Sequence, residues 1–139
     1  MRQVATTPQN AGYSGKPLAE KLGLKPGLTV YVDQPPAHLD TLIPGVDHAT
    51  RLPRQADVIL AFHTEAARLR RRLPILIEHT ALTGAVWICW PKKTSGVATD
   101  LGEGLVREIG LEAGVVDVKV AAVDETWSAL KFVRRLSDR

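Results

Sequence analysis

Apolar residues gather in three short runs along the chain, at residues 28–33, 56–62 and 85–90. Each run is rich in aliphatic and β-branched or aromatic side chains, and turn-forming or polar residues bound it, which is the pattern of a buried β-strand. A weaker run at residues 46–52 alternates between apolar and polar positions. We therefore expect three buried strands and a fourth strand with one exposed face.

Helical signals separate these runs. Pro17 and Gly23 favour the start and the end of a first short helix. Thr64 is placed to cap a helix that Pro74 interrupts, and Thr99 or Asp100 is placed to cap a later helix. The expected helices cover residues 17–22, 37–43, 65–73, 74–82 and 101–113.

The last part of the chain follows a different pattern. Residues 115–123 and 127–134 alternate, and a short polar turn joins them, which predicts an antiparallel hairpin. Alternating strands and helices followed by a hairpin predict an α/β fold, namely a three-layer Rossmann-like domain with a mainly parallel sheet and a C-terminal antiparallel hairpin. We assign residues 12–139 to this single domain and residues 1–11 to a flexible N-terminal segment.

Composition limits the compartment and the partners. The 139 residues carry a net charge of +3 and one cysteine, Cys89, which lies in an apolar run and has no partner for an internal disulfide. No apolar stretch approaches the ~20 residues that span a bilayer, and residues 1–10 lack the apolar core of a secretory signal. We expect a cytoplasmic protein without a membrane partner.

Four arginines lie close together near the end of one expected helix: Arg68, Arg70, Arg71 and Arg72. Their charge complements the negative end of the helix dipole, and it could also attract an acidic protein or a nucleic acid. Because no aromatic residues for base stacking are interleaved with them, we do not expect nucleic acid as a partner. A basic interaction module stays open as an alternative function.

The turn after the first strand lacks the residues of a nucleotide-binding loop. Such a loop uses glycine so that the backbone can approach its ligand, and it uses the amides of the next helix as donors. Residues 33–37 contain no glycine, and neither Pro35 nor Pro36 has an amide hydrogen. S-adenosylmethionine is therefore possible but disfavoured as a cofactor, and the cofactor stays unknown.

The histidines show no spacing that is typical of paired metal ligands, and we expect no metal site. The four are His38, His48, His63 and His79. His63 directly follows a buried strand and is the only one placed at an edge where parallel strands end. A single histidine is more often a hydrogen-bonded structural residue than a catalytic base.

A basic loop follows the run at residues 85–90. Lys92 and Lys93 could bind a phosphate or a carboxylate, and Ser95 and the Gly96 amide could complete an anion site. The alternative is a solvated turn that only covers the strand end. Open α/β sheets bind ligands where their strands end, so both interpretations stay open.

The terminal turn is expected at the same edge of the sheet. Asp124 and Trp127 could form an acid/base or ligand site beside the lysines, or they could only cap the turn and cover the sheet end. Tyr13 and Ser14 could fold over this edge as a lid, or they could only tie down the terminus.

Several short motifs carry a resemblance to a known family. They are residues 13–18, 21–23, 90–93, 95–96, 99–101, 116–119 and 124–128. Together they resemble a bacterial family of small proteins known only as a domain of unknown function, over residues 11–134. That resemblance implies a Rossmann-like fold and a shared site, but no activity. The order of elements also resembles a class I methyltransferase domain, which closes its parallel sheet with a terminal antiparallel pair.

These observations lead to one main hypothesis and two alternatives. The main hypothesis is a non-catalytic Rossmann-like domain that binds an anionic small molecule or a protein partner where the parallel strands end. The first alternative is a methyltransferase-like enzyme with a degenerate S-adenosylmethionine site, and the second is the basic interaction module. The missing glycine loop makes us lean against an enzyme.

Overall fold

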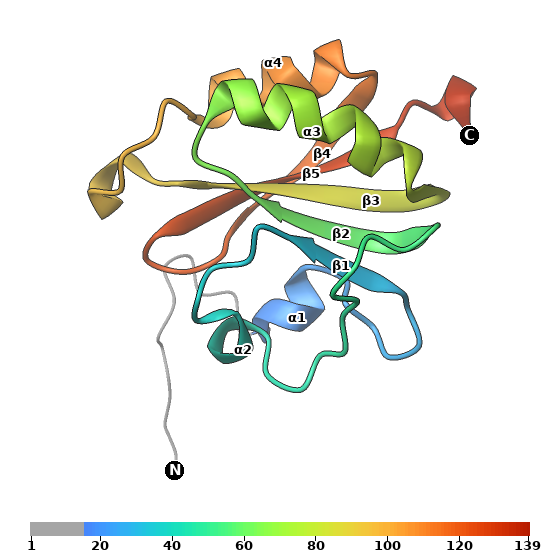
Figure 1. The fold of residues 1–139 in the computed structure, drawn as a ribbon, viewed down its shortest axis with the longest axis horizontal. Helices are drawn as coiled ribbons and strands as arrows, with labels where there is room; N and C mark the ends of the chain where they lie inside the picture. The colour runs from blue at the N-terminus through green and yellow to red at the C-terminus, as the bar shows by residue number, and fades with distance from the viewer. Residues whose placement is uncertain (1–15) are drawn as a thin grey trace.

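The protein folds into a five-stranded sheet between two layers of helices (Figure 1). The structure is a computed structural model that describes residues 16–139, so Tyr13 and Ser14 lie outside the described residues. Helices α3 (Ala66–Glu78) and α4 (Glu103–Glu112) cover one face, and the short α1 (Leu18–Lys21) and α2 (Leu39–Leu42) lie on the other. The expected three-layer α/β fold is confirmed.

The strands follow the order β1-β2-β3-β5-β4 across the sheet. Their bounds are β1 (Val30–Asp33), β2 (Ala56–Phe62), β3 (Thr80–Pro91), β4 (Val115–Ala122) and β5 (Trp127–Arg134). The first three strands pair in parallel, whereas β5 is antiparallel to both β3 and β4. The expected C-terminal hairpin is therefore present. We call the carboxyl ends of β1, β2 and β3, together with the turn at residues 123–126, the rim; it lies on the left in Figure 1.

The central strands are buried on both faces of the sheet, which explains why they are almost continuously apolar. Along β2, Ile59 belongs to the core under α3 and α4, whereas Leu60 belongs to the core on the α1 side. Trp87 is fully buried in the second core, where its indole nitrogen donates to the Leu22 carbonyl at 3.0 Å. Cys89 lies in the same core, and burial raises the pKa of its thiol well above the usual value. Cys89 is therefore a packing residue rather than a nucleophile.

Two expected elements differ in the structure. Residues 46–52 form no strand, and only Ala49 makes an isolated parallel bridge to Tyr31. Pro74 does not end a helix, because α3 runs through it to Glu78, and residues 80–82 already belong to β3. Leu69, Leu73 and Leu76 are fully buried along one face of α3. Their packing outweighs the backbone hydrogen bond that Pro74 cannot make.

The expected helix caps are also wrong. The residue at the N-cap position of α3 is Glu65 rather than Thr64. The residue at the N-cap position of α4 is Gly102 rather than Thr99 or Asp100. Instead, the Asp100 carboxylate accepts a hydrogen bond from the Ala66 amide at 2.8 Å, in the first turn of α3. The cap of α3 thus comes from another part of the chain.

None of the helices within residues 16–139 is long and apolar enough to cross a bilayer.

At Gly110, α4 packs directly against the sheet. A Cβ atom built at Gly110 would lie 2.1 Å from Cε1 of Phe132, which is 1% exposed on β5. A Cβ atom at Gly104, in the same helix, would meet no atom within 4 Å. The two glycines therefore have different roles, and only Gly110 is required by packing.

We expect Gly110→Ala to lower the free energy of unfolding by about 1–3 kcal/mol, because the buried Phe132 ring would have to shift to make room for the new methyl group. Gly104→Ala is the matched control, and it is expected to be neutral or stabilising by up to about 1 kcal/mol. Urea denaturation of both variants measures the difference. Equal stability of the two variants would contradict the packing argument.

Candidate functional site

Asp33 ends β1 at the rim and is only 1% exposed. One carboxylate oxygen, Oδ2, lies 2.9 Å from Nε2 of His63, the residue after β2. The other, Oδ1, lies 2.9 Å from Nη2 of Arg72 on α3 and accepts a hydrogen bond from its Nε at 3.0 Å. The Tyr31 hydroxyl donates to the same oxygen at 3.2 Å. We call Tyr31, Asp33, His63 and Arg72 the Asp33 cluster.

The backbone explains why these residues meet. Side chains two positions apart in a strand point to the same face, so Tyr31 and Asp33 both face the layer that contains α3. His63 continues β2 toward the rim, and its amide donates to the Cys89 carbonyl of β3 at 3.0 Å. Arg72 reaches the same point from above, because α3 crosses this face of the sheet. The cluster therefore links β1, β2 and α3.

The charges in the cluster support one another. Burial alone would raise the pKa of Asp33, but hydrogen bonds from His63 and Arg72, together with the Arg72 charge, hold it below the usual 3.8. The hydrogen bond to Asp33 raises the pKa of Arg72 despite burial. Burial, followed by the Asp33 charge, raises the pKa of Tyr31. At neutral pH the cluster thus holds an ionised carboxylate, a guanidinium and a protonated phenol.

His63 has one ring nitrogen without a partner. Its side chain is 1% exposed, and within residues 16–139 its Nδ1 atom has no hydrogen-bond partner. When the ring is neutral and its hydrogen lies on Nε2, that hydrogen bonds to Asp33 and leaves Nδ1 as an acceptor. A buried polar atom that stays unpaired costs about 1–3 kcal/mol. Chemically, Nδ1 could accept a proton while Asp33 stabilises the resulting imidazolium.

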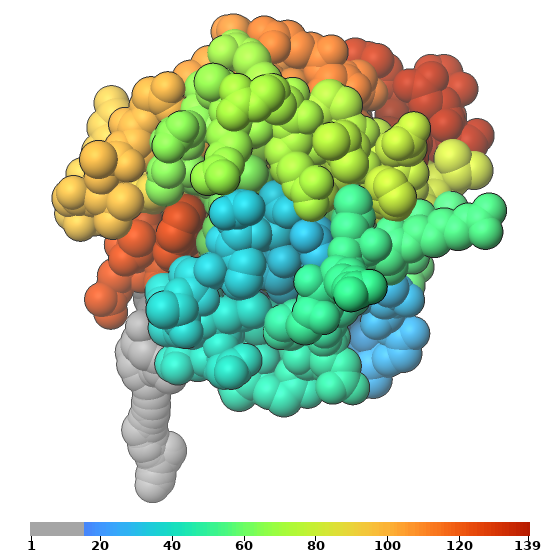
Figure 2. Space-filling model, viewed as in Figure 1, coloured from blue at the N-terminus to red at the C-terminus, as the bar shows by residue number. Residues whose placement is uncertain are grey.

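A cavity of about 440 Å³ lies beside the cluster at the carboxyl end of β1. Its lining residues are Tyr31, Val32, Asp33, Gln34, Pro35, His48, Ala49, Thr50 and Arg72. The volume falls within the range of roughly 300–1,000 Å³ that is usual for small-molecule sites. Figure 2 shows, on this face, the end of β1 and the loop after it lying directly against α3.

The cavity lies where the chain reverses its direction across the sheet. After β1 the chain passes to the outer side of β1, where Ala49 bridges Tyr31, and then crosses back to form β2 on the inner side. Such a topological switch point is where open α/β sheets bind ligands. Gln34, the first residue after β1, has a φ of 54° and is the only non-glycine residue with positive φ in the described part of the chain. The turn therefore adopts a conformation that usually favours glycine.

Part of the site expected from the sequence is brought together at the rim. The Lys92 ammonium group donates to the Asp124 carbonyl at 2.7 Å, and the Asp124 carboxylate accepts from the Trp127 amide at 2.7 Å. His38 Nε2 lies 2.9 Å from the other Asp124 oxygen, and the Trp127 ring packs edge-on against Phe62. These contacts support the turn at residues 123–126. A ligand-binding role for Lys92, Asp124 and Trp127 stays a prediction.

The other expected residues lie along the loop between β3 and α4. Lys93 and Gly96 line an open cavity of about 530 Å³ with residues 97–102. The Ser95 hydroxyl instead donates to the Lys92 carbonyl at 2.7 Å and accepts from the Val97 amide at 3.1 Å. Ser95 therefore stabilises the loop itself, and an anion-binding role for Lys93, Ser95 and Gly96 also stays a prediction.

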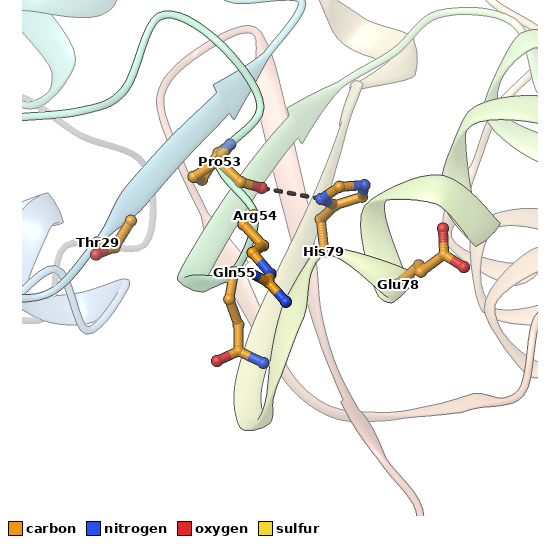
Figure 3. Close-up of a pocket in the computed structure, with 6 residues that line it drawn as sticks. All are labelled: Thr29, Pro53, Arg54, Gln55, Glu78 and His79. Carbon is orange, nitrogen blue, oxygen red and sulfur yellow. Dashed lines mark hydrogen bonds between the residues drawn. The ribbon is translucent and has the colours of Figure 1, made fainter.

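A larger cavity, of about 820 Å³, lies at the opposite end of the strands (Figure 3). It is lined by Thr29, Pro53, Arg54, Gln55, Glu78 and His79. None of these residues belongs to the Asp33 cluster or to the rim. The cavity at the switch point is therefore chosen as the candidate site for its position and its lining residues, and not because it has the larger volume.

Sequence analysis missed the Asp33 cluster as a unit. It placed His63 at the end of a strand, but it assigned Arg72 to a group of helix-terminal arginines. The sequence does contain one sign of the cluster. Tyr31 and Asp33 place a hydroxyl and a carboxylate on the same face of an otherwise apolar strand.

No protein-family model matches the chain, and no curated protein matches it. Solved structures do share its fold. Magnesium protoporphyrin IX methyltransferase from Synechocystis PCC 6803, solved with bound S-adenosylmethionine, is 14% identical with a TM-score of 0.59. That match covers 85% of this chain and 74% of the methyltransferase chain.

Two further methyltransferases have the same fold. A methyltransferase from Aquifex aeolicus that depends on S-adenosylmethionine is 14% identical with a TM-score of 0.53, over 83% of this chain and 86% of that chain. An O-methyltransferase from neocarzinostatin biosynthesis, solved with S-adenosylmethionine and a naphthoic acid, is 14% identical with a TM-score of 0.54. There the match covers 76% of this chain but only 41% of the other.

These comparisons correct the main expectation from the sequence. Identities this low establish the fold alone, and that fold is the Rossmann-like fold of class I methyltransferases. The hypothesis of a non-catalytic domain that binds an anion or a protein partner is contradicted, because the structural relatives are S-adenosylmethionine-dependent methyltransferases. The methyltransferase-like alternative has the better support.

We expect Asp33→Asn to lower the free energy of unfolding at neutral pH by about 3–5 kcal/mol, because Arg72 and His63 lose a buried anionic partner. The pKa of Asp33 in the folded state is below the unfolded value of 3.8. Its contribution is therefore fully present above that value and is lost as pH falls through the folded pKa. Urea denaturation from neutral to acidic pH should show a shallower acid loss in the variant than in the wild type.

Asp117→Asn is the matched control for this measurement. Asp117 also accepts a hydrogen bond from an arginine, Arg107, at 2.9 Å, but its side chain is 25% exposed. Its replacement is expected to cost less than about 1 kcal/mol. Equal losses in the two variants would mean that the Asp33 cluster stabilises the fold no more than a surface ion pair does.

Proposed function

We propose that this chain is a methyltransferase-like protein that binds S-adenosylmethionine in a glycine-free pocket at the carboxyl end of β1. The observation that carries the proposal is the cavity of about 440 Å³ at the switch point. It is supported by the fold that the chain shares with methyltransferases that were solved with this compound.

The lining of the cavity offers groups that fit the parts of S-adenosylmethionine. The Arg72 side chain is 30% exposed, so its guanidinium can bind the ligand carboxylate while it holds Asp33. His48 has a buried Nδ1 atom without a partner in residues 16–139, and it can accept a hydrogen bond from a ribose hydroxyl. Pro35 and Pro36 donate no amide hydrogens. Side chains would thus replace the usual cradle of backbone amides.

The Asp33 cluster offers a base beside this pocket. S-adenosylmethionine supplies an electrophilic methyl group on a sulfonium. His63 Nδ1 could take the proton of an acceptor hydroxyl or amine, and Asp33 would hold the ring and stabilise its positive charge. Because His63 is 3% exposed, an acceptor reaches Nδ1 only when the rim opens.

The finer family assignment also belongs to this proposal. The motifs of the chain resemble the bacterial domain-of-unknown-function family, and membership of that family is consistent with the methyltransferase-like fold.

The loop with Lys92, Lys93, Ser95 and Gly96 follows the central strand β3 at the rim. We assign it to the acceptor side of the proposed site.

We expect S-adenosylmethionine and its demethylated product to bind the wild-type protein with measurable heat in isothermal titration calorimetry. Thr50→Trp is expected to weaken binding at least tenfold, because Thr50 lines the cavity and an indole there would occupy part of its volume. Thr83→Trp, which places the same side chain at an exposed position near the amino end of β3 and outside this cavity, is the control and should bind as the wild type does.

Two results would count against the proposal. If millimolar S-adenosylmethionine gives no binding to the folded wild-type protein, the function is wrong. If it binds Thr50→Trp as tightly as the wild type, binding occurs elsewhere and the cavity assignment is wrong.

A further inference from the structure

The cavity at the amino end of the sheet is built from three segments that are distant in sequence (Figure 3). Thr29 precedes β1, residues 53–55 precede β2, and Glu78 and His79 close α3. Its volume is about 820 Å³. We call it the amino-end cavity. It lies opposite the rim, so it is separate from the proposed S-adenosylmethionine pocket.

Hydrogen bonds fix the walls of the amino-end cavity. The Ala56 amide donates to the His79 carbonyl at 2.7 Å, and the His79 ring donates from Nδ1 to the Pro53 carbonyl at 2.9 Å. This second bond leaves Nε2 of His79 for another partner. The Thr29 amide donates to the Asp57 carboxylate at 2.8 Å. Hydrogen bonds within the protein thus hold these walls in place, which lowers the cost of binding.

Two opposite charges line this cavity without pairing. Arg54 and Glu78 are both exposed, and neither forms an ion pair with any residue between 16 and 139. Figure 3 shows their charged ends apart, on either side of His79. Each charge is thus available to a ligand that fits between them.

The position of Glu78 is unfavourable for the helix itself. Glu78 is the last residue of α3, where the helix dipole disfavours a carboxylate by about 0.3–1 kcal/mol, and the last turn has no basic residue. Arg134 donates to the carbonyls of Ile77 and Ala81 at 2.6 Å and 2.7 Å, so the helix end is already satisfied. Helix stability therefore does not explain a carboxylate at this position, whereas a bound cation would.

We propose that the amino-end cavity binds a zwitterion of the α-amino acid class. The ligand carboxylate pairs with Arg54 and the Gln55 amide, and the ligand ammonium pairs with Glu78. His79 Nε2 and the Thr29 hydroxyl also line the cavity, and they contact the rest of the ligand. The volume exceeds that of a small amino acid, so a long side chain or a second residue fits in the cavity.

The test is an NMR titration of the full chain with three compounds of the same shape: L-leucine, 4-methylpentanoate without the ammonium, and 3-methylbutylamine without the carboxylate. L-leucine should shift the amide signals of Arg54, Gln55 and His79 at millimolar concentration, and each singly charged compound should bind at least tenfold more weakly. L-phenylalanine, L-glutamate and L-arginine extend the series. No shift with any amino acid would overturn the proposal, as would equal binding of 4-methylpentanoate.

Variants separate the two charges. Arg54→Gln and Glu78→Gln should each weaken L-leucine binding at least tenfold, and both positions are exposed, so the fold is retained. Arg51→Gln and Glu65→Gln change the net charge by the same amounts at exposed positions outside the cavity, and they should bind as the wild type does. Unchanged affinity in Arg54→Gln or Glu78→Gln would overturn the assignment. S-adenosylmethionine also carries an α-amino acid group, so its binding at the rim is measured separately, as the binding that Thr50→Trp weakens and Arg54→Gln leaves unchanged.

Discussion

The buried carboxylate of Asp33 is the constraint on which the rim depends. A carboxylate that is 1% exposed must have partners, because an unpaired buried charge costs far more than a single hydrogen bond contributes. His63 and Arg72 supply these partners from β2 and α3. The geometry of the strand ends is therefore set by electrostatics as much as by apolar packing. A ligand that binds at the rim must therefore leave His63 and Arg72 paired with this carboxylate or replace them as its partners.

This constraint also explains how the site departs from a glycine-rich cofactor loop. A ligand cannot enter between β1 and β2 without displacing the paired Asp33 and His63 side chains. The available space lies on the outer side of β1, where Ala49 makes only an isolated bridge and a cavity remains. Gln34 still adopts the left-handed conformation that a glycine loop uses. The backbone conformation of a glycine loop is thus kept at Gln34, whereas the side chains of the turn differ from those of such a loop. This difference is consistent with a modified pocket on a shared fold.

The sequence predicted those features that depend on local pattern. The runs that became β2 and β3 were identified because they are continuously apolar, and the hairpin was identified because its residues alternate with a period of two. Pro74 and the cap at Asp100 could not be predicted, because they depend on buried leucines and on an amide 34 residues away. The contact between Arg72 and Asp33 spans 39 residues and depends on how α3 crosses the sheet. Sequence analysis placed Asp33 and His63 at strand ends, but it did not bring Arg72 to them.

The two ends of the sheet differ in what their charges can do. At the rim, Asp33, His63 and Arg72 are paired and largely removed from water, so their positions are fixed before any ligand arrives. At the amino end, Arg54 and Glu78 face solvent without pairing with each other, so a ligand replaces only water. Preorganised buried charge favours chemistry on a bound molecule, whereas separated exposed charge favours recognition of a complementary one. The proposed reactive centre and the proposed recognition site therefore lie at opposite ends of the strands, which keep the two apart.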